Sequence, residues 1–95
     1  MTGKERAALR SQAHDLDPII NIGKESLTPQ VTQAIDDALE ARELIKIGVL
    51  KNCLDDPYEL ADMAADRTRS EVVQVIGRKF TLYRYNKKKH TGDRS

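Results

Sequence analysis

The sequence predicts an α/β fold: a two-layer sandwich in which three helices pack on a small, four-stranded mixed sheet. Two observations lead to this prediction. Three segments have apolar residues at helical spacing, and each follows a recognisable helix-start signal. Four short runs that alternate or are rich in β-branched residues lie between and after these segments. The expected order is αβαβαββ, and 95 residues are enough for one domain with one core.

The first helix is expected to run from Thr2 to about Ala13. Thr2 and Glu5 have the spacing of a capping box, in which each side chain bonds to the backbone N–H group of the other residue. One face of the helix is apolar and faces the core: Leu9, Ala13 and, just beyond, Leu16. A second stripe is basic and spaced by four: Arg6, Arg10 and His14. This stripe is either a solvated face or part of a binding surface.

The segment from Pro18 to Arg42 combines a short strand, a glycine-led turn and a second helix. Thr28 is suited to cap that helix, and Pro29 suits its first position because proline has no N–H group to leave unpaired. Apolar residues recur along it at helical spacing: Val31, Ala34, Ile35, Ala38 and Leu39. Its outer face is acidic: Asp36, Asp37, Glu40 and Glu43. Because no histidine accompanies this acidic cluster, we interpret it as a solvated surface rather than a metal or catalytic site.

Three strands and one helix complete the chain. A strand is expected at residues 44–50, and its alternation directs three residues to the core: Ile45, Ile47 and Val49. The third helix begins at Asp56-Pro57, with Glu59 completing a capping box, and runs to about Thr68. Its buried side is predicted to comprise Leu60, Ala61, Met63 and Ala64. Residues 71–76 and 79–85 form a hairpin, because Gly77-Arg78 suits a type II′ turn.

Charge is distributed unevenly along the chain. From Arg78 to the end there are seven basic residues and one acid, a net charge of +6, whereas the preceding 77 residues have a net charge of −5. This asymmetry indicates either a polyanionic partner for the basic end or a solubilising tail. Residues 86–95 are polar and lysine-rich and have nothing to bury. We therefore expect them to be disordered and the domain to span residues 1–85.

The composition offers little support for other classes of protein. The single cysteine, Cys53, has no disulfide partner and no neighbours at metal-ligand spacing, and His14 and His90 lack companions for catalysis. We expect no enzymatic activity, no metal and no cofactor. No segment resembles a membrane span or a signal peptide. The expected protein is therefore a cytoplasmic monomer that binds neither a membrane nor a small-molecule substrate.

The turn at residues 23–27 is the candidate binding site. The start of a helix presents unpaired N–H groups and the positive end of the helix dipole, which together attract anions. Lys24 adds a full positive charge beside this helix start, whereas Glu25 opposes it. Such a corner has two interpretations: an ordinary strand–helix connection, or a grip on a nucleic-acid backbone.

The chain resembles a known family in two strings of residues: AHDLDPIINIGKESLTPQVTQAIDDALEARELIKIGVLKNC, from Ala13 to Cys53, and EVVQVIGRKFTLYR, from Glu71 to Arg84. These strings look like the YhbY group of CRM domains, a name that abbreviates chloroplast RNA splicing and ribosome maturation. The resemblance extends from Thr2 to Tyr85 and implies the fold of the C-terminal domain of translation initiation factor three. It also implies a small RNA-binding protein that acts in assembly of the large ribosomal subunit.

The signature of this family is a G-x-x-G loop between the first strand and the second helix, likened to the loop with which KH domains clamp a nucleic-acid backbone. Gly23 and Lys24 match that loop, but its fourth position here is Ser26. Serine lacks the freedom of glycine to adopt a positive φ, although its hydroxyl can donate to a phosphate oxygen. Glu25 is not expected to contact RNA.

These observations lead to one main hypothesis and one alternative. The main hypothesis is a non-catalytic protein that binds structured ribosomal RNA of the precursor large subunit. Its contacts are expected in the loop, the first helix and the basic C-terminal segment: Gly23, Lys24, Ser26, Lys4, Arg6, Arg10, Arg84, Lys87, Lys88 and Lys89. Tyr83 and Tyr85 form either a small base-stacking surface or ordinary packing. The alternative is an adaptor that docks on a ribosomal protein or assembly GTPase through its acidic helix face.

Overall fold

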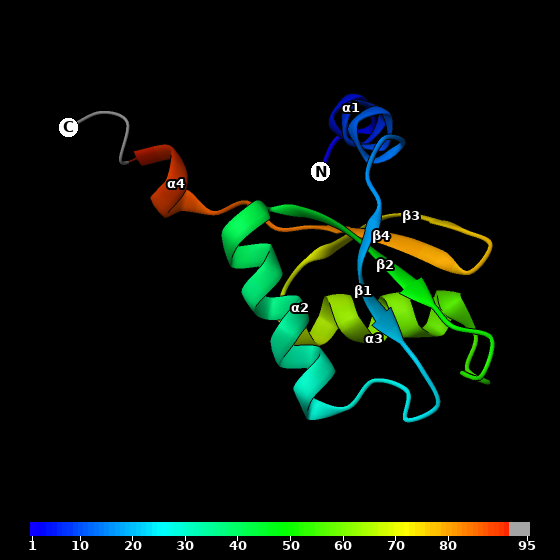
Figure 1. The fold of residues 1–95 in the computed structure, drawn as a ribbon. Coiled ribbons are helices and arrows are strands. Elements are labelled where there is room, and N and C mark those ends of the chain that lie inside the picture. Colours follow the sequence, from blue (N-terminus) through cyan, green and yellow to red (C-terminus); the bar gives the residue numbers. More distant parts are fainter. Residues whose placement is uncertain (92–95) are drawn as a thin grey trace.

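The computed structural model describes residues 1–91 and follows the predicted order of elements (Figure 1). The elements are α1 (Gly3–Ala13), β1 (Pro18–Ile22), α2 (Pro29–Arg42), β2 (Leu44–Val49), α3 (Pro57–Thr68), β3 (Glu71–Ile76), β4 (Lys79–Tyr83) and α4 (Lys87–Thr91). The first seven reproduce the expected αβαβαββ order, and the short α4 is additional. None of the helices in this part of the chain is long and apolar enough to cross a membrane.

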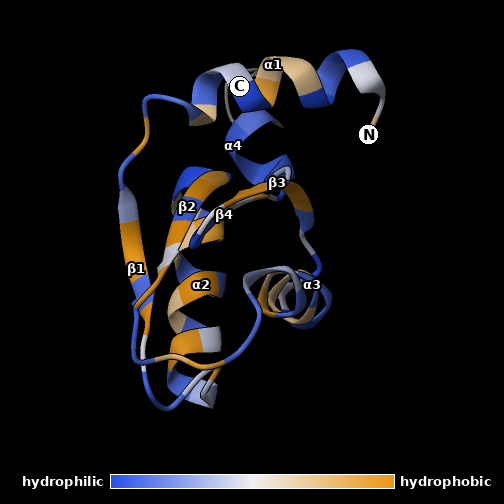
Figure 2. Ribbon diagram, turned by 90° about the vertical axis from the view of Figure 1, so that its right-hand side faces the viewer, coloured by the Kyte–Doolittle hydropathy of each residue, from blue (hydrophilic) through white to orange (hydrophobic). Residues whose placement is uncertain are grey.

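The four strands form one mixed sheet in the order β1-β2-β4-β3. β1 and β2 are parallel, whereas β4 runs antiparallel to both of its neighbours. α2 and α3 lie on one side of the sheet, and α1 lies on the other (Figure 1 and Figure 2). The predicted α/β fold with a mixed sheet is confirmed, and its helices are divided between the two faces.

The main core lies between the sheet and the pair α2 and α3. Its large buried side chains are Ile22, Ile35, Leu39, Ile45, Ile47, Leu60, Phe80 and Leu82. Burial of each such side chain contributes about 1.5–3 kcal/mol. The alternation predicted for the second strand is correct, since Ile45, Ile47 and Val49 all face this core.

Local signals set the helix starts and the hairpin turn as predicted. Thr2 and Glu5 form the reciprocal capping box of α1. Thr28 caps α2 by accepting a hydrogen bond of 3.1 Å from the N–H group of Val31. Gly77 has a φ of 58°, the positive value that the first central residue of a type II′ turn requires.

Two details predicted for α3 are wrong. Asp56 caps the helix by accepting from the N–H group of Tyr58 at 3.1 Å, and the described residues contain no return bond from Glu59. Met63 is 41% exposed rather than buried. The buried residues of α3 are 60, 61, 64, 65 and 68, a stripe at helical spacing that leaves position 63 outside it.

Beyond β4 the described chain continues into a short helix, in a segment that was expected to be a disordered tail. The strand ends at Tyr83, two residues before the predicted end, and residues 87–91 form α4. Asn86 anchors this segment: its N–H group donates to the Glu43 carboxylate at 2.7 Å, and its side-chain amide donates to the Glu40 carbonyl at 2.7 Å. These partners lie on α2 and at its end, so composition alone does not indicate them. Residues 92–95 of the predicted tail lie outside the described residues.

Candidate nucleic-acid interface

The loop between β1 and α2 contains a tight turn. The Ser26 N–H group donates to the Gly23 carbonyl at 2.9 Å, and the Thr28 N–H group donates to the Ser26 carbonyl at 3.1 Å. Ser26 has a φ of 61°, in the left-handed region that favours glycine, whereas the φ of Gly23 is not positive. The conformational demand therefore falls on the fourth position of the loop, where the family pattern has its second glycine.

The Ser26 hydroxyl donates a hydrogen bond to the carboxylate of Asp55, in the loop between β2 and α3. This bond offsets part of the cost of the positive φ. It also commits the hydroxyl within the protein, although we expected the hydroxyl to donate to a phosphate oxygen. Ser26 therefore positions the loop in this structure.

The loop between β2 and α3 lies beside the first loop and is held by Arg78. The Leu50 N–H group donates to the Ile22 carbonyl at 2.8 Å. The Arg78 guanidinium, in the β3–β4 turn, donates to the carbonyls of Val49 at 3.1 Å and of Leu50 and Cys53 at 2.8 Å. The β1–α2, β2–α3 and β3–β4 connections are thus joined by hydrogen bonds at one end of the sheet. These bonds preorganise the β1–α2 loop for binding.

Two groups beside this loop are available to an anion. Lys24 is exposed and makes no hydrogen bond or ion pair within the described residues. At the start of α2, Thr28 caps the Val31 N–H group and Pro29 has none, so Gln30 supplies the first-turn N–H group that lacks a partner in this part of the chain. The site therefore consists of one lysine, one backbone donor and the positive end of the helix dipole.

α1 contributes two available cations and one that is committed to the fold. Lys4 and Arg10 are exposed and have no side-chain partner among residues 1–91. Arg6 instead donates to the backbone carbonyls of Val72 and Val73, at the irregularity in the pairing of β3 with β4. A bulge disrupts the ladder and leaves carbonyls in need of donors, which Arg6 supplies. Within the predicted basic stripe, Arg10 is thus available to a ligand, whereas Arg6 stabilises the fold.

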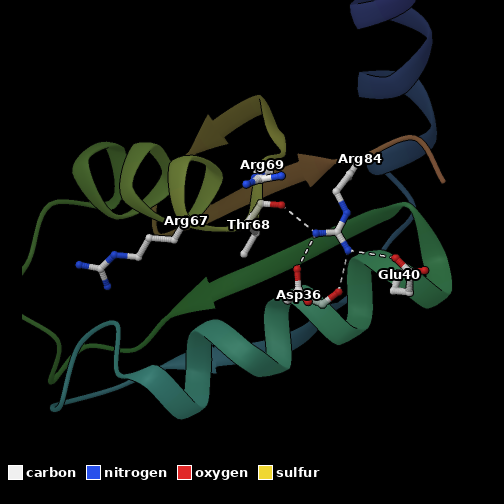
Figure 3. Close-up of a pocket in the computed structure, with 6 residues that line it drawn as sticks. All are labelled: Asp36, Glu40, Arg67, Thr68, Arg69 and Arg84. Atoms are coloured by element: carbon white, nitrogen blue, oxygen red, sulfur yellow. Dashed lines mark hydrogen bonds and ion pairs between the residues drawn. The ribbon is translucent and has the colours of Figure 1, made fainter. Parts of the chain in front are cut away.

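Arg84, which we expected to contact RNA, lies at the centre of an ionic cluster (Figure 3). Its Nη1 donates to the Asp36 carboxylate at 2.6 Å and to the Thr68 carbonyl at 2.7 Å. Its Nη2 donates to the Asp36 carbonyl at 3.0 Å and to the Glu40 carboxylate at 3.3 Å. The arginine side chain is only 19% exposed. Arg84 therefore joins α2, α3 and the end of β4, and it neutralises two acids of the predicted acidic face.

The lysines of α4 lie near the end of α2. Lys89 donates through Nζ to the Ala41 carbonyl, where a cation also stabilises the negative end of the helix dipole. Lys87 and Lys88 are exposed. A basic segment that was expected to be disordered is therefore attached to the domain on the side of α2.

Glu43 connects α4 to the end of α2. The hydrogen bond from the Asn86 N–H group, helped by His90 and Lys89, holds the pKa of the Glu43 carboxyl below its usual value of 4.5. The Nε2 atom of His90 lies 2.8 Å from that carboxylate. This contact links α4 to the end of α2.

The two tyrosines at the end of β4 are engaged within the protein. Tyr83 is half-buried beside Leu9 of α1. Its burial and, to a smaller extent, the negative charge of Glu43 raise the pKa of its hydroxyl. The ring of Tyr85 stacks on His90 with centroids 4.5 Å apart. Of the two interpretations offered for these rings, the structure favours packing.

Comparison with known proteins decides the family. A model of the CRS1 / YhbY (CRM) domain matches residues 1–84 of this chain. The chain belongs to the CRM domain family. One relative of this CRM protein, "Probable RNA-binding protein YqeI" of Bacillus subtilis, is 44% identical over 87 residues, which cover 92% of this chain and 91% of the relative. Another, "Probable RNA-binding protein MJ0652" of Methanocaldococcus jannaschii, is 41% identical over 86 residues, which cover 88% of this chain and 63% of the relative.

A solved structure agrees with this assignment. The solution structure of the hypothetical protein SAV1595 from Staphylococcus aureus has a TM-score of 0.79 and 50% identity to this CRM domain, and covers 92% of this chain and 91% of that one. The family expected from the two strings of residues is thus confirmed, and so is the fold. In this CRM domain the signature loop comprises residues 23–26.

Three further cations of the CRM domain were not among the contacts predicted from the sequence: Lys46, Lys51 and Lys79. None of them makes a hydrogen bond or ion pair within the described residues. Lys51 lies in the β2–α3 loop, whereas Lys46 and Lys79 lie on the sheet. The strand alternation that directs Ile45 and Ile47 to the core directs Lys46 to the opposite face, so this signal was available from the sequence. No group of side chains within residues 1–91 is arranged to hold a metal ion.

Proposed function

We propose that this CRM domain binds structured ribosomal RNA in the precursor of the large ribosomal subunit, without a catalytic step. Gly23, Lys24 and the first turn of α2 bind the RNA backbone, on a loop that Ser26 positions, and Lys24 pairs with a phosphate. Lys4 and Arg10 of α1 extend the contact, and Lys88 of α4 adds charge. In this proposal the protein acts in the cytoplasm as a monomer.

The observation that carries the proposal is an unpaired lysine on a fixed loop. The bond from Ser26 to Asp55 and the three carbonyl contacts of Arg78 hold the loop and its neighbour. Little conformational entropy is therefore lost when a phosphate binds there. The Lys24 ammonium has no partner within the described residues, so its charge is available to the ligand. The names of the relatives give RNA as the class of ligand.

Fewer acidic side chains on α2 are free to dock a protein partner, as the adaptor alternative requires, than the sequence indicated. Arg84 pairs with Asp36 and Glu40, and Gln33 donates to the Asp37 carboxylate at 2.9 Å. The substitution Asp37→Lys separates the two hypotheses without disturbing Arg84. It should abolish docking on a protein partner and leave RNA binding intact.

The test is RNA binding by the wild type and by Lys24→Glu over a series of salt concentrations. The probes are fragments of large-subunit ribosomal RNA and an unrelated structured RNA. With about four to six phosphates engaged, the log–log slope of affinity against salt is expected to be about −3 to −5. Lys24→Glu should weaken binding tenfold or more, which corresponds to about 1.4 kcal/mol.

Arg42→Glu is the matched control, since it makes the same change of charge at the opposite end of α2. Arg42 is exposed and has no partner among the described residues. If Arg42→Glu and Lys24→Glu weaken binding equally, net charge rather than the loop determines affinity and the proposal is wrong. If the wild type binds neither RNA, the adaptor alternative takes its place.

A further inference from the structure

The face of the sheet opposite α2 and α3 is covered by α1 at one end only. Beyond α1 lies a hollow of about 260 Å³, lined by His14, Lys46, Gln74, Ile76, Lys79 and Thr81. The pairing of the strands places these residues in two rows. Gln74, Thr81 and Lys46 are partners across β3, β4 and β2, and Ile76, Lys79 and Gly48 are partners in the next row. The first row continues to Pro18 and the second to Asn21, both on β1.

The lining of this hollow is basic and contains no carboxylate. Lys46 lies opposite Thr81, and Lys79 lies diagonally from Lys46 on the same face, within reach of its long side chain. Like charges at this spacing repel each other, and no acid lines the hollow to offset that repulsion. Within the described residues neither lysine makes a hydrogen bond or an ion pair. This arrangement contrasts with the fold-stabilising arginines Arg6, Arg78 and Arg84, each of which has several partners.

An apolar surface and hydrogen-bonding groups lie beside the two lysines. Ile76 is 65% exposed and pairs directly with Lys79 across the strands. The Gln74 amide lines the same hollow and has no side-chain partner in the described part of the chain, whereas Thr81 beside it is only 1% exposed. An exposed apolar side chain next to a free amide suits a flat ring with polar edges, and flanking cations suit the phosphates joined to it.

The path from the signature loop to this hollow is short and continuous. Asn21 pairs with Gly48, in the row of Lys79, and lies two residues before Gly23. Gly48 has no side chain, and a Cβ there would come within 2.5 Å of the Asn21 Oδ1 atom. The space above Gly48 is therefore filled by the Asn21 side chain, which connects the loop to the open face of the sheet.

We propose that this hollow holds one unpaired nucleotide of the RNA bound at the signature loop. Lys46 and Lys79 pair with the phosphates on either side of the nucleotide. Its base packs on Ile76, and the Gln74 amide bonds to the edge of the base. The inference rests on the proposed function and adds a place where this CRM domain distinguishes one base from another.

The test compares Lys46→Gln/Lys79→Gln with the control Arg42→Gln/Arg69→Gln, which removes two exposed cations from other parts of the surface. The RNA probes are the ribosomal fragment and single-stranded oligo(A), oligo(C) and oligo(U) of about 12 nucleotides, within the range of site sizes known for single-strand binding. The lysine double variant should bind both kinds of RNA about tenfold more weakly. Its salt slope should be smaller by about 1.4, the value for two phosphates of a single strand. The control should change neither quantity by as much.

The base-reading part is tested with Gln74→Leu. Wild type should prefer one of the three oligonucleotides, and Gln74→Leu should lose that preference without a change in salt slope. The inference is overturned if the lysine double variant behaves like the control, if wild type binds no oligonucleotide, or if Gln74→Leu keeps the preference. Loss of binding in Lys24→Glu together with normal binding in the lysine double variant would leave the proposed function standing and remove this inference alone. Thermal unfolding of each variant verifies that it is folded.

Discussion

Replacing Arg84 with methionine is expected to lower the free energy of unfolding by about 2–4 kcal/mol and to leave the RNA affinity of the folded protein unchanged. The two ion pairs contribute about 0–1 kcal/mol each, because Asp36 and Glu40 are 45% and 56% exposed. Thr68 is only 2% exposed. Without Arg84 its buried carbonyl loses a hydrogen-bond donor, which costs a further ~1–3 kcal/mol. Methionine keeps much of the packing of the arginine stem.

The assay is equilibrium unfolding in urea, with Arg69→Met as the matched control. Arg69 lines the same depression as Arg84, but it is exposed and has no side-chain partner in the described residues. For a domain of this size the dependence of stability on urea is about 1 kcal/mol per molar, so the midpoint for Arg84→Met should fall by about 2 M or more. The midpoint for Arg69→Met should change by less than about 0.5 M.

The reasoning would be refuted in either of two ways. If Arg84→Met unfolds at the same urea concentration as the control, the four hydrogen bonds do not stabilise the fold. A folded Arg84→Met protein that binds RNA tenfold more weakly than Arg69→Met would instead show that Arg84 contacts RNA, as the sequence alone suggested.

Two further predictions concern the segments on either side of α2. Because the folded pKa of Glu43 lies below 4.5, its carboxylate stabilises the protein above that pH and the contribution is lost as pH falls through the lower, folded value. Urea unfolding near neutral pH should show Glu43→Gln less stable than wild type, a difference that disappears in acid; a difference independent of pH would contradict the assignment. At the signature loop, Ser26→Gly should be about 1 kcal/mol more stable than Ser26→Ala, since both lose the bond to Asp55 but only glycine relieves the positive φ. Thermal unfolding should separate them by about 4–8 °C, and equal midpoints would refute the claim that strain is stored at this position.

The sequence by itself determined the first seven elements of this protein and their order, but not α4. Thr2, Thr28 and Gly77 act on backbone groups within a few residues of themselves, so their effects can be predicted without knowledge of the fold. Strand alternation likewise determined which residues of β2 face the core, because the period of two is a property of the extended backbone. The family also followed from the sequence, since its motifs are strings of residues in fixed order.

The tertiary structure decided which side chains are available for binding. Arg84 and Asp36 are 48 positions apart, and Arg6 and Val72 are 66 positions apart. A cation looks the same in the sequence whether it ends beside a carboxylate, beside a bulge in a strand or in solvent. Only the packing of the sheet against α1, α2 and α3 brings those partners together, and it commits Arg6 and Arg84 to the fold while leaving Lys24, Lys46 and Lys79 without partners among the described residues.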